Sequence, residues 1–148
     1  MKIAFDMDNT LLDDSGKIIR PGIEDLLNKL LKKEYELFVW TNSPKARANL
    51  LLNDTKLKNY FSGIIAREDY DKENKNLPKD IKRFGFDVLI DDDPAEIKYN
   101  KSRGNKAILI KSFRSVNTKL NLNETKDLLI EIESREGLLG KMLKNLGM

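Results

Sequence analysis

Two aspartates near the start of the chain, Asp6 and Asp8, follow a short and largely apolar run, Lys2–Phe5. Residues two apart in an extended strand point to the same side, so these carboxylates can converge where the strand ends. Two carboxylates that converge in this way repel each other unless a cation or a proton lies between them. Mg²⁺, a hard cation that prefers oxygen ligands, would neutralise them, and a carboxylate beside Mg²⁺ can act as a nucleophile toward phosphorus.

A second acidic cluster lies farther along the chain in a matching context. Asp91, Asp92 and Asp93 follow another β-branched and apolar run, Val88–Ile90. An Asp-x-Asp motif alone is more often a solvated turn than a functional site. Three consecutive acids at the end of a buried strand are costly unless something compensates their charge. Two strands that both end in acids therefore indicate one shared cation.

The composition narrows the chemistry that these 148 residues can perform. The chain has no cysteine and no histidine, which excludes disulfides, zinc–thiolate sites, cysteine catalysis and Ser–His triads. The net charge of +3, with acids and bases interspersed, falls short of a nucleic-acid-binding signature. No leader-like segment and no apolar run of membrane-spanning length is present. We therefore expect a single cytoplasmic domain, residues 1–148, with no membrane contact.

Strand-like and helix-like segments alternate along the chain, and this alternation predicts an α/β fold. The expected strands are 2–5, 37–40, 61–65, 88–90 and 107–110. The expected helices are 23–31, 46–52, 78–84, 95–101 and 128–132. The predicted architecture is a three-layer, Rossmann-like parallel sheet with helices on both faces. Ligands of such sheets bind beyond the carboxyl ends of the strands, where both acidic clusters fall. All four prolines are expected in the first turn of a helix, namely Pro21, Pro44, Pro78 and Pro94.

Four motifs follow one another at these strand ends: Asp6–Leu11, Val39–Ser43, Lys75, and Asp91–Glu96. In this order, they resemble the motifs of the haloacid dehalogenase superfamily, across residues 2–110. Lys75 opens a Lys-x-Leu sequence sixteen residues before Asp91. That spacing is similar to the one in capless phosphatases that act on the RNA polymerase carboxy-terminal domain. The resemblance implies a Mg²⁺-dependent phosphomonoesterase that works through an aspartyl-phosphate.

The resemblance also implies roles for individual residues. Asp6 would attack phosphorus, while Asp8 would protonate the leaving group and then activate water. Thr41 would hydrogen-bond the phosphoryl oxygens, together with the amide of Asn42. These roles supply the in-line positioning and charge stabilisation that phosphoryl transfer requires.

A lysine would neutralise charge between the phosphate and the nucleophile. By the Lys-x-Leu resemblance we assign this role to Lys75, with Lys79 as the alternative in the same lysine-rich stretch. The implied metal ligands are Asp6, the backbone carbonyl of Asp8, Asp92 and, as a ligand or a supporting acid, Asp91.

Some polar residues near these motifs have ordinary structural explanations. Ser43 is expected to cap the helix that begins near Pro44. Asp93 and Glu96 match a capping box, although the superfamily also uses an acid near the metal at the offset of Glu96. Both roles of Glu96 remain open at this point.

The inserts that carry cap domains in this superfamily are short here. Leu12–Pro21 has room only for a flap with a turn at Asp13–Gly16, and Thr41–Lys75 holds only a helix, a strand and a loop. A capless, open site suits a phosphoprotein or a nucleic-acid end; a small phosphate ester is the alternative if a second subunit supplies a lid. The apolar helical stripe of Leu138–Leu146 either packs on the sheet or docks a partner, such as a second copy of the chain.

Two other functions compete with a phosphatase. A phosphate-accepting receiver domain also gathers acids, a hydroxyl and a lysine at strand ends, but it needs an aspartate after the third strand. Here that strand ends in Ile64-Ile65-Ala66-Arg67. A catalytically idle binding module could keep the fold, although Asp6, Asp8, Thr41 and Asp92 are all intact.

Overall fold

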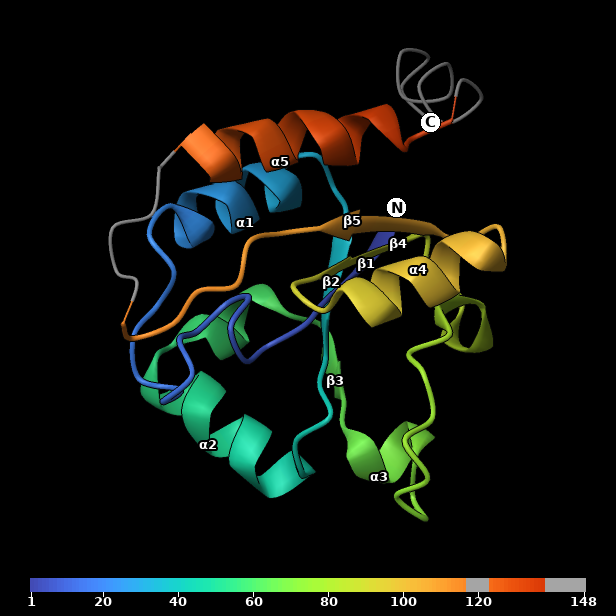
Figure 1. Cartoon of the computed structure of the whole chain (residues 1–148). Coiled ribbons are helices and arrows are strands. Elements are labelled where there is room, and N and C mark those ends of the chain that lie inside the picture. The colour runs from blue at the N-terminus through green and yellow to red at the C-terminus, as the bar shows by residue number, and fades with distance from the viewer. Residues whose placement is uncertain (117–122, 138–148) are drawn as a thin grey trace.

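In the computed structural model, residues 1–116 and 123–137 are described (Figure 1). Five strands form one parallel sheet: β1 (Lys2–Phe5), β2 (Glu36–Trp40), β3 (Gly63–Ile65), β4 (Val88–Asp91) and β5 (Lys106–Leu109). Their order in space is β3-β2-β1-β4-β5. The α-helices are α1 (Ile23–Lys32), α2 (Lys45–Asp54), α3 (Arg67–Tyr70), α4 (Pro94–Ser102) and α5 (Asn123–Ser134). Short 3-10 helices cover Leu57–Tyr60 and Ile81–Phe84.

Alternation along the strands divides the core into two layers. Ile3 and Phe5 of β1 face the larger cluster, which contains buried leucines of α1, α2 and α5. Ala4 points the other way, into a cluster with Trp40 and with Ile97 of α4. Figure 1 shows α1 and α5 side by side on one face of the sheet and α4 on the other. The three-layer α/β prediction is therefore confirmed.

The order of the strands argues against the receiver alternative. Receiver domains have the flavodoxin-like order 2-1-3-4-5, in which the first strand lies between the second and the third. Here β1 pairs with β2 and β4 instead. This pairing also confirms that the strand bearing Asp6 lies beside the strand bearing Asp91.

Several local expectations need correction. Only Pro94 lies in the first turn of a helix; Pro44 is the N-cap of α2, and Pro21 precedes the N-cap of α1. The helix expected at 78–84 is reduced to the 3-10 helix Ile81–Phe84, because the backbone of Lys79 forms its hydrogen bonds with side chains of α4. The short helix α3 was not expected. The Leu138–Leu146 stripe lies outside the described residues.

No cap domain is present in either described insert region. The segment after β1 is a tightly folded loop in which Asp13 is fully buried and accepts hydrogen bonds from the backbone of Lys17 and Ile18. Between β2 and β4 the chain forms only helices, β3 and a loop. Within the described parts of the chain, no helix is both long and apolar enough to cross a membrane.

Arg20 connects this loop to the segment after β5 and to α5. Its side chain is 1% exposed, and Nε donates to the Thr10 carbonyl at 2.6 Å. One terminal nitrogen donates to the carbonyls of Asn9 and Lys111, and the other lies 3.5 Å from a carboxylate oxygen of Glu124. One buried guanidinium thus joins the loop after β1, the segment after β5 and α5.

Replacing Arg20 with methionine should lower the free energy of unfolding by about 3 kcal/mol, because several buried acceptors lose their donors at once. Urea unfolding monitored by circular dichroism measures the change. As a control, Arg103→Gln removes an exposed arginine and should change stability by less than about 0.5 kcal/mol. An Arg20→Met protein as stable as this control would show that the guanidinium does not hold these segments together.

Candidate active site

The carboxyl ends of β1 and β4 bring three aspartates together. The Asp6 amide donates to the Ile90 carbonyl at 2.9 Å, which continues the strand pairing just beyond β1. Asp6, Asp91 and Asp92 each offer a carboxylate oxygen, and these oxygens lie within 4.8 Å of one another. The expected convergence of the two acidic motifs is therefore present.

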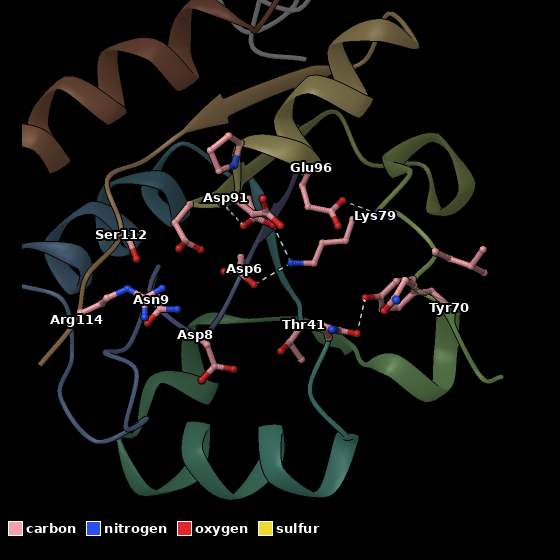
Figure 2. A pocket seen from close by; sticks show the side chains of 16 residues that line it. Asp6, Asp8, Asn9, Thr41, Tyr70, Lys79, Asp91, Glu96, Ser112 and Arg114 are labelled. Carbon is pink, nitrogen blue, oxygen red and sulfur yellow. Dashed lines mark hydrogen bonds and ion pairs between the residues drawn. The ribbon is translucent and has the colours of Figure 1, made fainter. Parts of the chain in front are cut away.

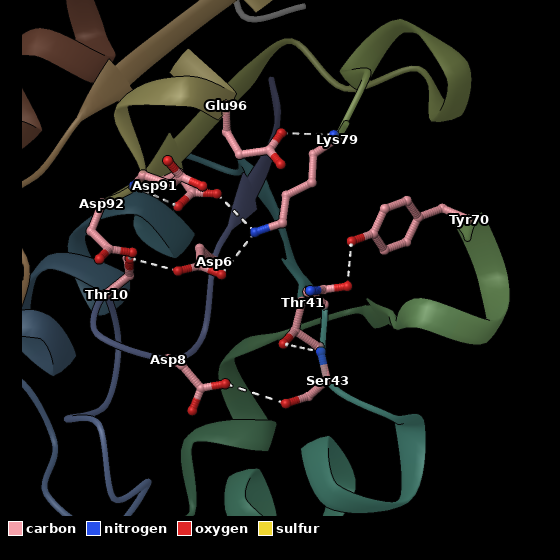
Figure 3. Close-up of polar contacts among 12 residues, drawn as sticks. Asp6, Asp8, Thr10, Thr41, Ser43, Tyr70, Lys79, Asp91, Asp92 and Glu96 are labelled. Carbon is pink, nitrogen blue, oxygen red and sulfur yellow. Dashed lines mark hydrogen bonds and ion pairs between the residues drawn. The ribbon is translucent and has the colours of Figure 1, made fainter. Parts of the chain in front are cut away.

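The ammonium group of Lys79 bridges Asp6 and Asp91 on the side away from Asp92, as Figure 3 shows. Its side chain is almost completely buried, and its Nζ lies 2.8 Å from Asp6 Oδ1 and 2.8 Å from Asp91 Oδ2. The Lys79 amide donates to Glu96 Oε2, and its carbonyl accepts from the buried side chain of Asn100. Two residues of α4 thus fix the backbone from which the ammonium group reaches the carboxylates.

The structure does not place Lys75 at this site. Its side chain is 67% exposed and pairs with Glu73 at 2.5 Å. The Asp71 carboxylate accepts from the backbone amides of Lys75 and Leu77, which folds this loop into a turn. Asn76 and Leu77 of this turn line the pocket beside the carboxylates, whereas Lys75 does not. The lysine beside Asp6 is Lys79, which the sequence analysis offered as the alternative to Lys75.

Burial and charge act against each other in this cluster. Burial raises the pKa values of Asp6 and Asp91 to about 6, although the Lys79 ammonium works in the opposite direction. Burial alone would lower the pKa of Lys79, but its ion pairs with both aspartates raise it. Lys79 therefore stays protonated at neutral pH, and one ammonium faces three carboxyl groups once Asp92 is counted.

Thr10 connects the third carboxylate to the first. Its hydroxyl lies 3.0 Å from Asp6 Oδ2 and 3.3 Å from Asp92 Oδ1. No described residue forms an ion pair with Asp92. The cluster therefore keeps oxygen ligands and excess negative charge, which fits a hard divalent cation such as Mg²⁺.

Asp8 lies apart from this cluster and is held by α2. Arg47 donates to both of its oxygens, at 2.8 and 3.0 Å, and this pairing raises the pKa of Arg47. The Ser43 hydroxyl lies 3.3 Å from Asp8 Oδ2 (Figure 3). The prediction that Ser43 caps α2 is wrong, since Pro44 is the N-cap and makes no side-chain capping bond. The sequence did not predict the contact between Arg47 and Asp8, because these residues meet only when α2 folds against the sheet.

Thr41 and Asn42 follow β2 at the same edge of the sheet. Thr41 is almost completely buried, its amide donates to Ile65, and its Oγ1 accepts from the Ser43 amide. Asn42 Oδ1 accepts a hydrogen bond from the Tyr70 hydroxyl at 3.2 Å. Because this bond uses only the side-chain oxygen, the side-chain nitrogen of Asn42 can donate to a ligand.

A pocket of about 620 Å³ joins these groups (Figure 2). Of the expected site residues, all but Lys75 line it: Asp6, Asp8, Thr41, Asn42, Asp91 and Asp92. Lys79 and Glu96 line it as well. The expected capping box is half present: Asp93 caps α4 through the Ala95 amide, whereas the Glu96 carboxylate binds the Lys79 amide.

Comparison with known proteins agrees with this fold. A hydrolase from Streptococcus pneumoniae TIGR4 superposes with a TM-score of 0.60 at 14% identity, over 78% of this chain and 94% of its own. The D,D-heptose 1.7-bisphosphate phosphatase from B. bronchiseptica, complexed with magnesium and phosphate, gives 0.61 at 15% identity, over 88% of this chain and 99% of its own. At these identities, the likeness shows the fold alone. Among curated proteins there is no significant sequence match.

The family comparison covers nearly the whole chain. The model of the NLI interacting factor-like phosphatases matches residues 1–138. The match includes both acidic motifs, Thr41 and Lys79, which the structure gathers in one pocket. The chain therefore belongs to the NLI interacting factor-like phosphatase family of the haloacid dehalogenase superfamily, and it is a phosphatase.

Proposed function

We propose that this protein is a Mg²⁺-dependent phosphomonoesterase with Asp6 as its nucleophile. One observation carries the proposal: a buried lysine bridges Asp6 and Asp91 at the edge of the sheet where Asp92 also lies. A surface cluster of acids would have no need of a buried cation, whose desolvation is costly. Such a preorganised group of charges suits the transfer of an anionic phosphoryl group.

Asp6, Asp91 and Asp92 would hold the metal, with the Asp8 backbone carbonyl as a further predicted ligand. Bound Mg²⁺ would supply positive charge to the phosphoryl oxygens and orient the ester. A similarly folded phosphatase was solved with magnesium and phosphate, which supports this choice of cation. The proposal rests mainly on the three converging carboxylates.

In the proposed reaction, a carboxylate oxygen of Asp6 forms a bond to phosphorus while the bond to the leaving alcohol breaks. Asp8 gives that alcohol a proton. Asp8 then takes a proton from water as the water attacks phosphorus, which releases phosphate and restores Asp6. Lys79 remains protonated beside Asp6 and offsets the negative charge.

The remaining polar groups position the reactants. The Thr41 hydroxyl and the Asn42 amide would hydrogen-bond the phosphoryl oxygens, since both line the pocket beside the nucleophile. Arg47 binds both oxygens of the Asp8 carboxyl, and the Ser43 hydroxyl binds one of them. A catalytically idle module has no need of these supports, so their presence favours an enzyme over that alternative.

The substrate that we propose is large or has an exposed phosphate, such as a phosphoprotein or a nucleic-acid end. No cap covers the described part of the pocket, so binding energy has to come from the surface around its mouth. From the loop that precedes Lys79, Asn76 and Leu77 line the pocket, so this loop is one part of that surface. A small phosphate ester is the second candidate, if another subunit closes the site.

Asp6→Asn should lower kcat for p-nitrophenyl phosphate by at least about a thousandfold, because the amide cannot form the covalent intermediate. The protein should stay folded by circular dichroism, since the side chain keeps its size. Asp25→Asn, a matched change on the exposed face of α1, should retain wild-type turnover. Near wild-type activity of Asp6→Asn would rule out Asp6 as the nucleophile.

Mg²⁺ should raise the melting temperature more at about pH 8 than at about pH 5. With pKa values of about 6, Asp6 and Asp91 are mostly protonated at the lower pH, so the metal must displace protons there. Thermal unfolding in Mg²⁺ and in EDTA measures the shift, and Asp92→Asn should reduce it. An equal shift at both pH values, or one that Asp92→Asn leaves intact, would place the metal elsewhere.

Phosphorylated macromolecules should give a higher kcat/KM than sugar phosphates. A screen of phosphopeptides, 3′- and 5′-phosphorylated oligonucleotides and small esters tests this expectation. If the best substrate is polyanionic, its KM should rise with salt because screening weakens its attraction to cations at the pocket, such as Arg114. The open-site explanation would be wrong if a small metabolite were hydrolysed far better than every peptide and oligonucleotide.

A further inference from the structure

One side of the pocket carries polar groups that the proposed mechanism does not use. Asn9, Ser112 and Arg114 line it together, and Figure 2 shows them on the side away from Tyr70 and Lys79. Asn9 comes from the loop after β1, while Ser112 and Arg114 come from the segment after β5. We call these three residues the Arg114 wall.

The polar groups of the Arg114 wall have unused binding capacity. Asn9 Oδ1 and Ser112 Oγ are buried, yet neither has a hydrogen-bond partner among the described residues. Arg114 forms no ion pair with any described carboxylate. Buried polar atoms without partners are uncommon in folded proteins, and inside a pocket they mark places where a ligand can bind.

The backbone of the Arg114 wall is held firmly. The Phe113 amide donates to the Asn9 carbonyl at 2.8 Å, and Arg20 donates to that same carbonyl and to Lys111. Farther on, the Ser115 amide donates to the Asp14 carboxylate at 2.7 Å. The two segments therefore keep their relative positions, and a ligand need not pay to order them.

Charge distinguishes the Arg114 wall from the rest of the pocket. Lys79 is already paired with two carboxylates, and Asp8 is paired with Arg47, which does not line the pocket. Arg114 is thus the one lining cation, within the described chain, whose charge no carboxylate offsets. Around the phosphate itself the aspartates would repel a second anion, whereas Arg114 would attract one.

We propose that the Arg114 wall binds a second anionic group, carried by the leaving alcohol of the substrate. This inference rests on the proposed function, in which Asp8 protonates that alcohol. Asn9 follows Asp8 directly, so a leaving group beside Asp8 lies next to the wall. The Arg114 guanidinium would bind the anion through two hydrogen bonds, and the Ser112 hydroxyl would donate to a neighbouring oxygen. Asn9 Oδ1, which can only accept, would take a hydrogen bond from a hydroxyl of the leaving alcohol.

Either of two sources could supply this anion: the second phosphate of a small bisphosphate, or the phosphodiester next to a nucleic-acid end. Paired substrates separate them. The small pair is a sugar bisphosphate and its monophosphate. The second pair is a 5′-phosphorylated oligonucleotide and the same strand with a neutral methylphosphonate at the first linkage. For each pair we define the anion preference as the ratio of the two kcat/KM values.

The wild type should show an anion preference of about tenfold or more in at least one pair, and that pair identifies the source. Arg114→Gln should reduce that preference about tenfold, mainly through KM, and Arg114→Lys should restore part of it. The matched control is Lys101→Gln, which removes the same charge from α4 outside the pocket and should leave the preference unchanged.

Three outcomes would overturn the inference. The wild type could hydrolyse p-nitrophenyl phosphate without an anion preference in either pair. Arg114→Gln could lower kcat/KM equally for both members of a pair, or Lys101→Gln could reduce the preference as much as Arg114→Gln does. A wild type that hydrolyses none of these esters, p-nitrophenyl phosphate included, would instead refute the proposed function, and this inference with it.

Discussion

The ammonium group of Lys79 lies between the carboxylates that end β1 and β4, and the rest of the site depends on this contact. Parallel pairing of the two strands forces Asp6 and Asp91 together, so their charges must be offset within the protein. Lys79 does so only in part, because Asp92 adds a third carboxyl group nearby. The remaining negative charge is what makes the site a good place for a divalent cation.

Two arginines fix what surrounds this centre. Arg20 is buried beneath the loop after β1 and ties it to the segment after β5, which sets one wall of the pocket. Arg47 reaches from α2 to Asp8 and fixes the carboxyl assigned to proton transfer. The geometry of the site therefore depends on side chains that contact backbone carbonyls and carboxylates far away in sequence. In the proposed mechanism, contacts that stabilise the fold also position the reacting groups.

The sequence was sufficient to predict the sheet, which follows from hydrophobic periodicity, and the acidic cluster, which follows from the residues at the strand ends. Alternating apolar runs predicted the sheet, and acids directly after two strands predicted that Asp6, Asp91 and Asp92 meet. Lys75 lies outside the pocket for a local reason: hydrogen bonds from the loop amides to Asp71 and the left-handed backbone of Asn76 fold that loop with the Lys75 side chain exposed, which motif spacing cannot reveal. Contacts across the fold, such as those of Arg47, need the packed helices before they can be recognised.

The most direct test of the account is to trap the bond between Asp6 and phosphorus. Borohydride reduces an aspartyl-phosphate to homoserine, so quenching the enzyme with borohydride during turnover should convert Asp6 to homoserine. Peptide mass spectrometry locates the modified residue. The account predicts homoserine at position 6 only when both substrate and Mg²⁺ are present. Active enzyme with an unmodified Asp6, or with homoserine at another aspartate, would contradict it.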